Sequence, residues 1–183
     1  MSAERRTIVD KAQLGLMIDR ICHQLIEDHD DFLNTVILGL QPRGVVLAQR
    51  VHSRLKELTG NSEILFGKLD ATLNRDDLRR REIPILPADT SIDFQLEDKR
   101  VVLVDDVLFT GRTIRAGLDA MLSFGRPRTV ELLVLIDRRF SRQLPIEPKY
   151  VGTTIDTISS ERVEVSLLGN DEDSVTLFSE SKQ

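Results

Sequence analysis

The sequence predicts an α/β fold in which a central, mostly parallel β-sheet is flanked by helices. Short apolar, β-branched runs alternate with longer segments whose apolar residues recur at helical spacing, a pattern typical of parallel strands connected through helices. The 183 residues are 40% hydrophobic and 30% charged, which suits one globular domain with a sizeable core. We therefore expect a single domain over residues 1–183.

The first part of the chain predicts a helix, a strand and a second helix. An amphipathic helix is expected over about 10–28, with Asp10 as its candidate N-cap. A buried strand is expected at 35–40. A sharp turn at 42–44 then leads into a second amphipathic helix, which Gly60 is placed to end.

The middle of the chain continues this alternation around one long interruption. A strand is expected over 62–73, and the charged, proline-containing segment 74–97 then breaks the pattern, as lids and disordered segments do. A strongly apolar strand at 101–104, a helix at about 112–124 and a strand at 129–136 follow. After Asp137, short extended segments near Tyr150, Val163 and Val175 suggest a small appended subdomain.

Composition excludes several classes of protein. The net charge of -5 argues against a domain that is basic all over, and the absence of Trp disfavours a stacking platform for single strands. Cys22 is the only cysteine, so an internal disulfide and a cysteine metal site are impossible. We find no apolar run of the roughly 20 residues that a membrane span needs and no secretory signal, and we expect a cytoplasmic protein.

Residues 101–113 carry the main functional signal. The four apolar residues 101–104 predict a central strand that delivers Asp105 and Asp106 to its C-terminal end, where open α/β sheets bind ligands. Adjacent carboxylates are suitable acceptors for the vicinal hydroxyls of a sugar. Residues 110–113 predict a tight loop opening a helix, whose N–H groups and dipole favour a phosphate. A diol site beside a phosphate site indicates a ribose 5-phosphate.

This segment has two other interpretations. In the simpler one, a buried strand ends in a solvated Asp-Asp turn and a threonine merely caps the helix. In the other, the acidic pair belongs to a P-loop NTPase, which also needs a Gly-x-x-x-x-Gly-Lys-[Ser/Thr] loop. Gly39 and Gly44 have the required spacing, but Val45 and Val46 occupy the positions of the lysine and the hydroxyl, so this class is excluded.

The run Leu-Val-Asp-Asp-Val-Leu-Phe-Thr-Gly-Arg-Thr within 101–113 is similar to the motif that binds phosphoribosyl pyrophosphate (PRPP) in type I phosphoribosyltransferases. It resembles in particular the PyrR family of pyrimidine-operon attenuators with uracil phosphoribosyltransferase activity. The resemblance implies the type I fold, with a core over about 10–136, a small C-terminal hood over about 137–180 and a long flexible loop. Further matching segments are the pyrophosphate loop at 39–44, the active-site loop at 69–78 and the base-covering hood at 135–138, 144–146 and 150–152.

The resemblance implies a reaction in which uracil and PRPP give UMP and pyrophosphate, with Mg²⁺ bound to the pyrophosphate. Asp105 and Asp106 are then expected to hold the ribose hydroxyls, directly or through Mg²⁺, and Arg43 to bind pyrophosphate. Arg75 is expected to reach the pyrophosphate from a closing lid. The other substrate-binding candidates are Gln41, Pro42, Gly44, Asp76, Asp77, Val107, Leu108, Phe109, Thr110, Gly111, Arg112, Thr113 and, on the base side, Asp137 and Arg138.

The resemblance also implies a second function, in which UMP-loaded dimers bind a stem-loop of pyrimidine-operon mRNA, and it implies a homodimer or tetramer. A scatter of solvated charges is the alternative interpretation of the basic residues, and the net charge favours it. Two other functions remain open: a phosphoribosyltransferase for another base, and an RNA-binding regulator that senses nucleotide with little turnover. The basic candidates are Arg20, Arg138, Arg139, Arg142 and Lys149.

Overall fold

The computed structural model describes residues 4–75, 89–158, 161–169 and 173–179. Its strands are β1 Glu4–Val9, β2 Thr35–Leu40, β3 Leu65–Leu69, β4 Arg100–Leu108, β5 Thr129–Arg139, β6 Tyr150–Asp156, β7 Glu161–Ser166 and β8 Ser174–Ser179. Its helices are α1 Lys11–His29, α2 Arg43–Thr59 and α3 Arg112–Met121, with short 3-10 helices η1 Thr72–Asn74 and η3 Leu122–Phe124.

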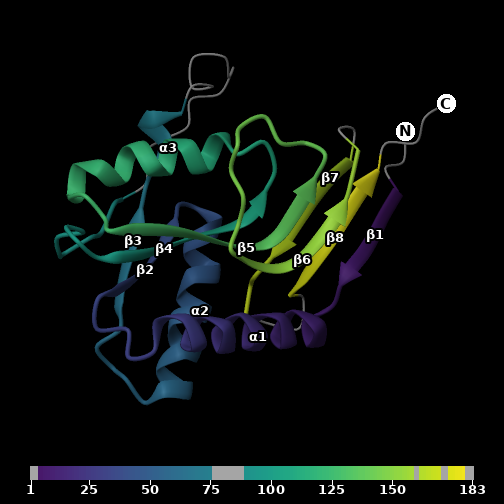
Figure 1. The fold of residues 1–183 in the computed structure, drawn as a ribbon. Helices are drawn as coiled ribbons and strands as arrows, with labels where there is room; N and C mark the ends of the chain where they lie inside the picture. Colours follow the sequence, from purple (N-terminus) through teal and green to yellow (C-terminus); the bar gives the residue numbers. More distant parts are fainter. Residues whose placement is uncertain (1–3, 76–88, 159–160, 170–172, 180–183) are drawn as a thin grey trace.

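The strands form two sheets (Figure 1). The larger sheet has five strands in the order β3-β2-β4-β5-β6, and every neighbouring pair is parallel. The smaller sheet has three antiparallel strands in the order β1-β8-β7. The predicted α/β class with a mostly parallel central sheet is therefore confirmed.

Helices cover both faces of the parallel sheet. Figure 1 shows α3 on one face and α1 and α2 on the other. Ile21 of α1 and Leu47 of α2 belong to the same core cluster as Val102 of β4. On the other face, Ile114 of α3 belongs to a second cluster with Leu103. Among the described residues, no helix is long and apolar enough to span a membrane.

The predicted ends of the first two helices are confirmed. The Asp10 side chain accepts a hydrogen bond from the Gln13 N–H (2.8 Å), and the Gln13 side chain accepts one from the Asp10 N–H (3.1 Å), which completes a capping box. Gly60 ends α2 in the left-handed conformation, with φ 67°. Local hydrogen bonding thus fixes these boundaries without help from distant residues.

The strand expected over 62–73 is shorter, because β3 covers only Leu65–Leu69. Asn61 and Asp70 account for the difference. The Asn61 side chain accepts from the Glu63 N–H (2.8 Å), and the Asp70 carboxylate accepts from the Thr72 N–H (2.9 Å). These turns form at either side of the strand and divert the backbone from the sheet ladder.

The extended segments expected near 150, 163 and 175 are the strands β6, β7 and β8. β6 pairs in parallel with β5 and so extends the large sheet, whereas β7 and β8 form the small sheet with β1. Arg50 of α2 joins the small sheet to the core, since its guanidinium donates two hydrogen bonds to the Asp173 carboxylate (2.6 and 3.0 Å). The strand β1 was not predicted from the sequence.

Candidate active site

Asp105 and Asp106 lie side by side in β4, near the C-terminal ends of the parallel strands. They are only 8% and 7% exposed. The Asp106 N–H donates to Asp105 Oδ1 (3.0 Å), and the Val107 N–H donates to Asp106 Oδ1 (2.9 Å). Burial, followed by the neighbouring charge of Asp106, raises the pKa of Asp105 well above its usual range. Burial also raises the pKa of Asp106, although the Arg43 charge opposes this. Such a pair favours a cation or hydroxyl donors as its ligand.

The loop after β4 leads from this pair into α3. Gly111 occupies the N-cap position with φ 89°, and no side chain of the described residues caps the helix in the usual way. The Arg112 N–H contacts Thr110 Oγ1 at 3.4 Å. The first-turn N–H groups and the positive end of the helix dipole favour an anion at this position. The N-cap residue is therefore Gly111 rather than either threonine of the simpler interpretation.

A pocket of about 300 Å³ joins the acidic strand end to this helix start. Nine of the predicted site residues contribute to its wall, eight of them from 105–113, and Asp106 is not among them. Arg75, which follows η1, also lines it, and its charge is among those that lower the pKa of Asp105, against the larger effect of burial. The lining residues are Arg75, Asp105, Val107, Leu108, Phe109, Thr110, Gly111, Arg112, Thr113 and Ile114.

The predicted pyrophosphate loop lies beside the acidic pair. Arg43 Nη1 is 4.0 Å from Asp106 Oδ2, and Gly44 packs against the backbone of β4. The Gln41–Pro42 peptide bond is cis. The Gln41 N–H donates to the Leu69 carbonyl (2.9 Å), which ties this loop to the end of β3. Asp76 and Asp77, expected in the lid, lie outside the described residues.

The acidic pair has the chemistry of a Mg²⁺ site that is completed by a ligand. Among the described residues, no group of three or more His, Cys, Asp or Glu side chains comes together as a metal site. Asp105 and Asp106 alone offer two buried carboxylates, which suits an ion that binds one or two carboxylates together with phosphate oxygens and water. The residues present therefore fit Mg²⁺ delivered with a phosphorylated ligand.

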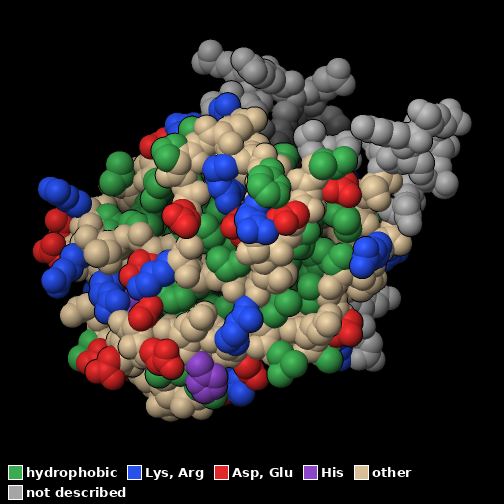
Figure 2. Space-filling model, turned by 45° about the vertical axis from the view of Figure 1, so that its right-hand side comes forward, with side chains coloured by type: hydrophobic (Ala, Val, Ile, Leu, Met, Phe, Trp, Pro, Cys, Tyr) green, Lys and Arg blue, Asp and Glu red, His purple; other side chains and the backbone are tan. Residues whose placement is uncertain are grey.

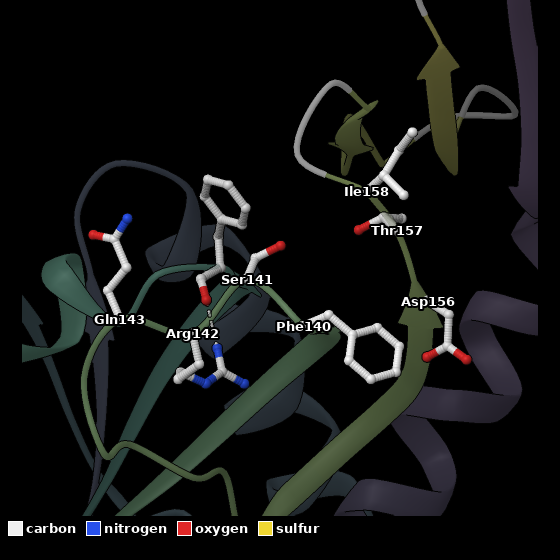
Figure 3. Close-up of a pocket in the computed structure, with 8 residues that line it drawn as sticks. Phe140, Ser141, Arg142, Gln143, Asp156, Thr157 and Ile158 are labelled. Atoms are coloured by element: carbon white, nitrogen blue, oxygen red, sulfur yellow. Dashed lines mark hydrogen bonds between the residues drawn. The ribbon is translucent and has the colours of Figure 1, made fainter.

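A second pocket, of about 720 Å³, opens between the turn after β5 and the end of β6 (Figure 3). Phe109 belongs to the walls of both pockets, so the two are neighbours. In Figure 3 the Phe140 side chain extends toward Asp156 across the opening, and it is 83% exposed. The sequence did not single out most of this wall. The lining residues are Phe109, Phe140, Ser141, Arg142, Gln143, Asp156, Thr157 and Ile158.

The turn after β5 is hydrogen-bonded to the loop between β4 and α3. Arg142 donates to the Phe109 carbonyl (2.7 Å) and, through its other terminal nitrogen, to the Asp137 carboxylate. The Gln143 N–H donates to the Thr110 carbonyl (3.0 Å). Asp137, a predicted base-side residue, is therefore engaged by Arg142, and Arg142 itself spans the two loops rather than pointing freely into solvent.

The other basic residues proposed for RNA also have partners within the chain. Arg20 donates to the Val151 carbonyl (3.0 Å) and to that of the following glycine. Arg139 pairs with the Asp156 carboxylate (2.7 Å), and Lys149 pairs with the carboxylates of Asp28 and Glu131, both at 2.9 Å. On the face shown in Figure 2, basic side chains lie among acidic ones. An RNA bound there would have to compete with these internal partners for the basic side chains.

Comparison with known proteins decides the family. A family profile described as "Phosphoribosyl transferase domain" matches residues 5–168. The bifunctional protein PyrR of Clostridioides difficile is 42% identical over 175 residues, covering 95% of this chain and 98% of that protein. The bifunctional protein PyrR of Deinococcus radiodurans is 44% identical over 179 residues, covering 97% of each chain. The chain belongs to the PyrR family of phosphoribosyltransferases.

Solved structures show that this PyrR-family chain has the type I phosphoribosyltransferase fold. A hypoxanthine phosphoribosyltransferase of Trypanosoma cruzi matches 94% of this chain and 95% of its own, with a TM-score of 0.70 at 14% identity. One from Staphylococcus aureus matches 91% and 85%, with a TM-score of 0.67 at 20% identity. The resemblance inferred from residues 101–113 is confirmed, and the PyrR-family motif lines the 300 Å³ pocket described above.

Proposed function

We propose that this PyrR-family protein transfers the phosphoribosyl group of PRPP to uracil, giving UMP and pyrophosphate, and that it also binds pyrimidine-operon mRNA in response to UMP. The observation that carries the catalytic proposal is the shared 300 Å³ pocket, with a buried carboxylate, Asp105, on one wall and the start of α3 on the other. Membership of a family whose relatives are named bifunctional supports the double role.

The pocket suits the ribose 5-phosphate part of PRPP. The vicinal hydroxyls would donate to the carboxylates of Asp105 and Asp106, which are buried and therefore gain from such donors. The 5-phosphate would accept from the N–H groups of 110–113 and from the hydroxyls of Thr110 and Thr113, at the positive end of α3. The site thus offers negatively charged acceptors to the ribose hydroxyls and positively polarised donors to the phosphate.

The pyrophosphate would lie between Arg43 and Arg75. Arg43 stands beside Asp106, and Arg75 lines the pocket, so both guanidinium groups border the acidic pair. Asp105 and Asp106 would hold Mg²⁺ directly or through water. When bound, Mg²⁺ would neutralise negative charge on the pyrophosphate. The two arginines would stabilise the additional negative charge of the leaving pyrophosphate.

The reaction would then be a displacement at the anomeric carbon. The bond from C1 to pyrophosphate breaks, and its electron pair leaves with the pyrophosphate oxygen. Uracil N1 forms the new bond to C1 and releases its proton to solvent. Positive charge develops on the ribose ring, by analogy with glycoside cleavage, and the buried carboxylates of Asp105 and Asp106 stabilise it. The protein's main contributions are thus orientation and electrostatic stabilisation.

The 720 Å³ pocket would accept the base. It adjoins the ribose pocket through Phe109, and the turn that carries Ser141 and Gln143 supplies polar and main-chain groups at its wall. Transfer to another base is the second candidate reaction, and an assay with several bases decides between the two.

For the regulatory role, we propose that RNA phosphates displace the internal partners of Arg20, Arg139, Arg142 and Lys149. Phosphate contacts would make the affinity fall as salt is raised. Since PRPP, uracil and mRNA are cytoplasmic, we place the protein in the cytoplasm, as a homodimer or tetramer. The alternative is a regulator that binds nucleotide and RNA with little turnover.

The decisive experiment measures nucleotide formation from PRPP and Mg²⁺ with uracil, hypoxanthine, guanine and orotate in parallel. We expect UMP and pyrophosphate in equal amounts and little product from the other bases. Preference for a purine or for orotate would replace uracil by that base. Absence of turnover with all four, together with UMP-dependent binding of a pyrimidine-operon stem-loop, would establish the regulator instead.

A further inference from the structure

Arg138 is a buried cation that holds the connection between β6 and β7. It is 5% exposed, although it stands near the end of β5. Its Nε donates to Thr157 Oγ1 (2.8 Å), and its Nη2 donates to the carbonyls of Glu161 (2.8 Å) and Ile158 (3.3 Å). All three acceptors are neutral, so these bonds orient the guanidinium without neutralising its charge.

The guanidinium of Arg138 lies against the ring of Phe109. The Arg138 Cζ atom is 4.1 Å from the ring centroid, well within the distance at which a cation and an aromatic face attract each other. The attraction is strongest where water is excluded, and Arg138 is almost completely buried. The main chain of Phe109 is held as well, because its carbonyl accepts from Arg142 (2.7 Å).

Phe109 is the residue through which the two pockets meet. It lines the 300 Å³ pocket together with Asp105 and the start of α3, and it lines the 720 Å³ pocket together with Thr157 and Ile158. Phe109 is 36% exposed, so the other residues that line the two pockets do not fully surround its ring. A ring in this position is fixed by the groups that touch it, and the contact with Arg138 restricts its face.

We infer that Arg138 is a positioning residue for the reaction: it holds the Phe109 ring as the shared wall between the base pocket and the phosphoribosyl pocket. This inference rests on the proposed function, which assigns the two pockets to the base and to PRPP. It differs from the expectation that Arg138 binds the base itself. A fixed wall sets the distance between the two substrates, which must meet in one orientation.

A double-mutant cycle tests the inference through the Michaelis constants. Arg138→Lys keeps the positive charge but loses the flat guanidinium that stacks on the ring, and Phe109→Leu keeps apolar bulk but loses the ring. Each single variant is expected to raise the KM for both uracil and PRPP about tenfold, as for a desolvated cation–π contact, with a smaller change in kcat. The double variant is expected to show no further increase, because both changes remove one interaction.

Two outcomes would overturn the inference. In the first, Arg138→Lys raises the KM for uracil by the same factor in the Phe109→Leu background as in the wild type, which would mean direct contact with the base. In the second, Arg138→Lys leaves both Michaelis constants unchanged. Arg54→Lys is the matched control, since Arg54 lies on α2 and pairs with Asp19 and Glu57. It should leave both constants at their wild-type values.

A second comparison covers the case in which Arg138→Lys does not fold. Phe109→Tyr keeps the aromatic face and should raise both Michaelis constants less than Phe109→Leu does. Equal losses in these two variants would contradict the inference. The wild type is measured first, and if it forms no nucleotide, the proposed function fails. If the wild type turns over normally but the effects of Arg138→Lys and Phe109→Leu on KM are independent, only the role of Arg138 is rejected.

Discussion

Gly44, in the first turn of α2, lies directly against the backbone of Asp105 in β4. A Cβ atom on residue 44 would come within 2.9 Å of the Asp105 Cα, and it would lie closer still to the Val104 carbonyl oxygen. Both neighbours are backbone atoms, so neither can move without displacing a strand. The loop carrying Arg43 and the acidic pair are therefore held as close together as two backbones allow.

Gly44→Ala should separate this loop from the acidic pair. We expect kcat/KM for PRPP to fall and the free energy of unfolding to drop by about 1–3 kcal/mol, the usual cost of overpacking. Steady-state kinetics and chemical denaturation measure the two effects. Gly15→Ala is the control, because a Cβ atom there meets nothing within 4 Å and should stabilise α1 by about 0.5–1 kcal/mol. A wild-type KM in Gly44→Ala would contradict the proposed geometry.

Asp106→Asn should reduce turnover, because it replaces the proposed charged acceptor for the ribose diol and for Mg²⁺ by a neutral one. We expect roughly a hundredfold loss in kcat, comparable with the removal of one electrostatic stabiliser in other enzymes. UMP formation at saturating PRPP and Mg²⁺ measures it. Asp119→Asn, on the exposed side of α3, should retain full activity. Unchanged activity in Asp106→Asn would refute its assignment.

The raised pKa of Asp105 predicts the pH dependence of stability in the absence of ligand. Burial raises this pKa above the value in the unfolded chain, so the folded state binds the proton more tightly. The resulting stabilisation is complete below the ordinary carboxyl pKa and is lost as pH rises through the raised value. We expect the free energy of unfolding to decline over that window, and less so in Asp105→Asn. Binding of Mg²⁺ and PRPP should strengthen over the same window, since it requires the charged form.

His29, which lies near the N-terminal ends of the parallel strands, predicts the opposite dependence of stability on pH. It is buried and contacts Thr35 (3.0 Å), Glu131 (2.9 Å) and Tyr150 (3.1 Å). Burial, followed by the Arg100 charge, lowers its pKa. Its contribution to stability is therefore present above about pH 6.5 and is lost as pH falls through the lowered value. Thermal unfolding of His29→Asn should depend less on pH in that window than unfolding of the wild type, with kcat at neutral pH preserved.

Lys149 and Asp28 offer a test of the RNA proposal that works in both directions. Asp28→Asn removes one of the two carboxylates that hold Lys149, so it should strengthen binding of the stem-loop, whereas Lys149→Gln should weaken it. If Lys149 contacts a phosphate, its loss should also reduce the slope of log affinity against log salt by about one. Equal affinities in both variants would place the RNA elsewhere.

Short-range chemistry accounts for what could be predicted from the sequence. The N-cap at Asp10, the end of α2 at Gly60 and the strand leading to Asp105 and Asp106 all depend on neighbouring residues, and the structure confirms each of them. The family motif adds the loop that surrounds the 300 Å³ pocket. Local signals therefore located the element that lines the proposed phosphoribosyl site.

What the sequence did not reveal depends on distant contacts. Arg138 follows an apolar strand and could equally face solvent, and only its bonds to Thr157 and Glu161 show that it is buried. The wall formed by Phe140 and Ile158 brings together two turns that are separate in the chain. Apolar and polar residues alternate too weakly in 4–9 to predict a strand. β1 forms through its pairing with β8, which is distant in the sequence.

That pairing has a consequence for how the protein is made. Glu4 lies opposite Ser179, so β1 leaves the ribosome long before the strand with which it pairs. The parallel sheet from β2 to β6 contains none of these residues, and all of its strands are synthesised before β8. Because every strand of the parallel sheet precedes β8 in the chain, we expect this sheet to form first and the small sheet to close last, a late step typical of contacts between remote parts of a polypeptide.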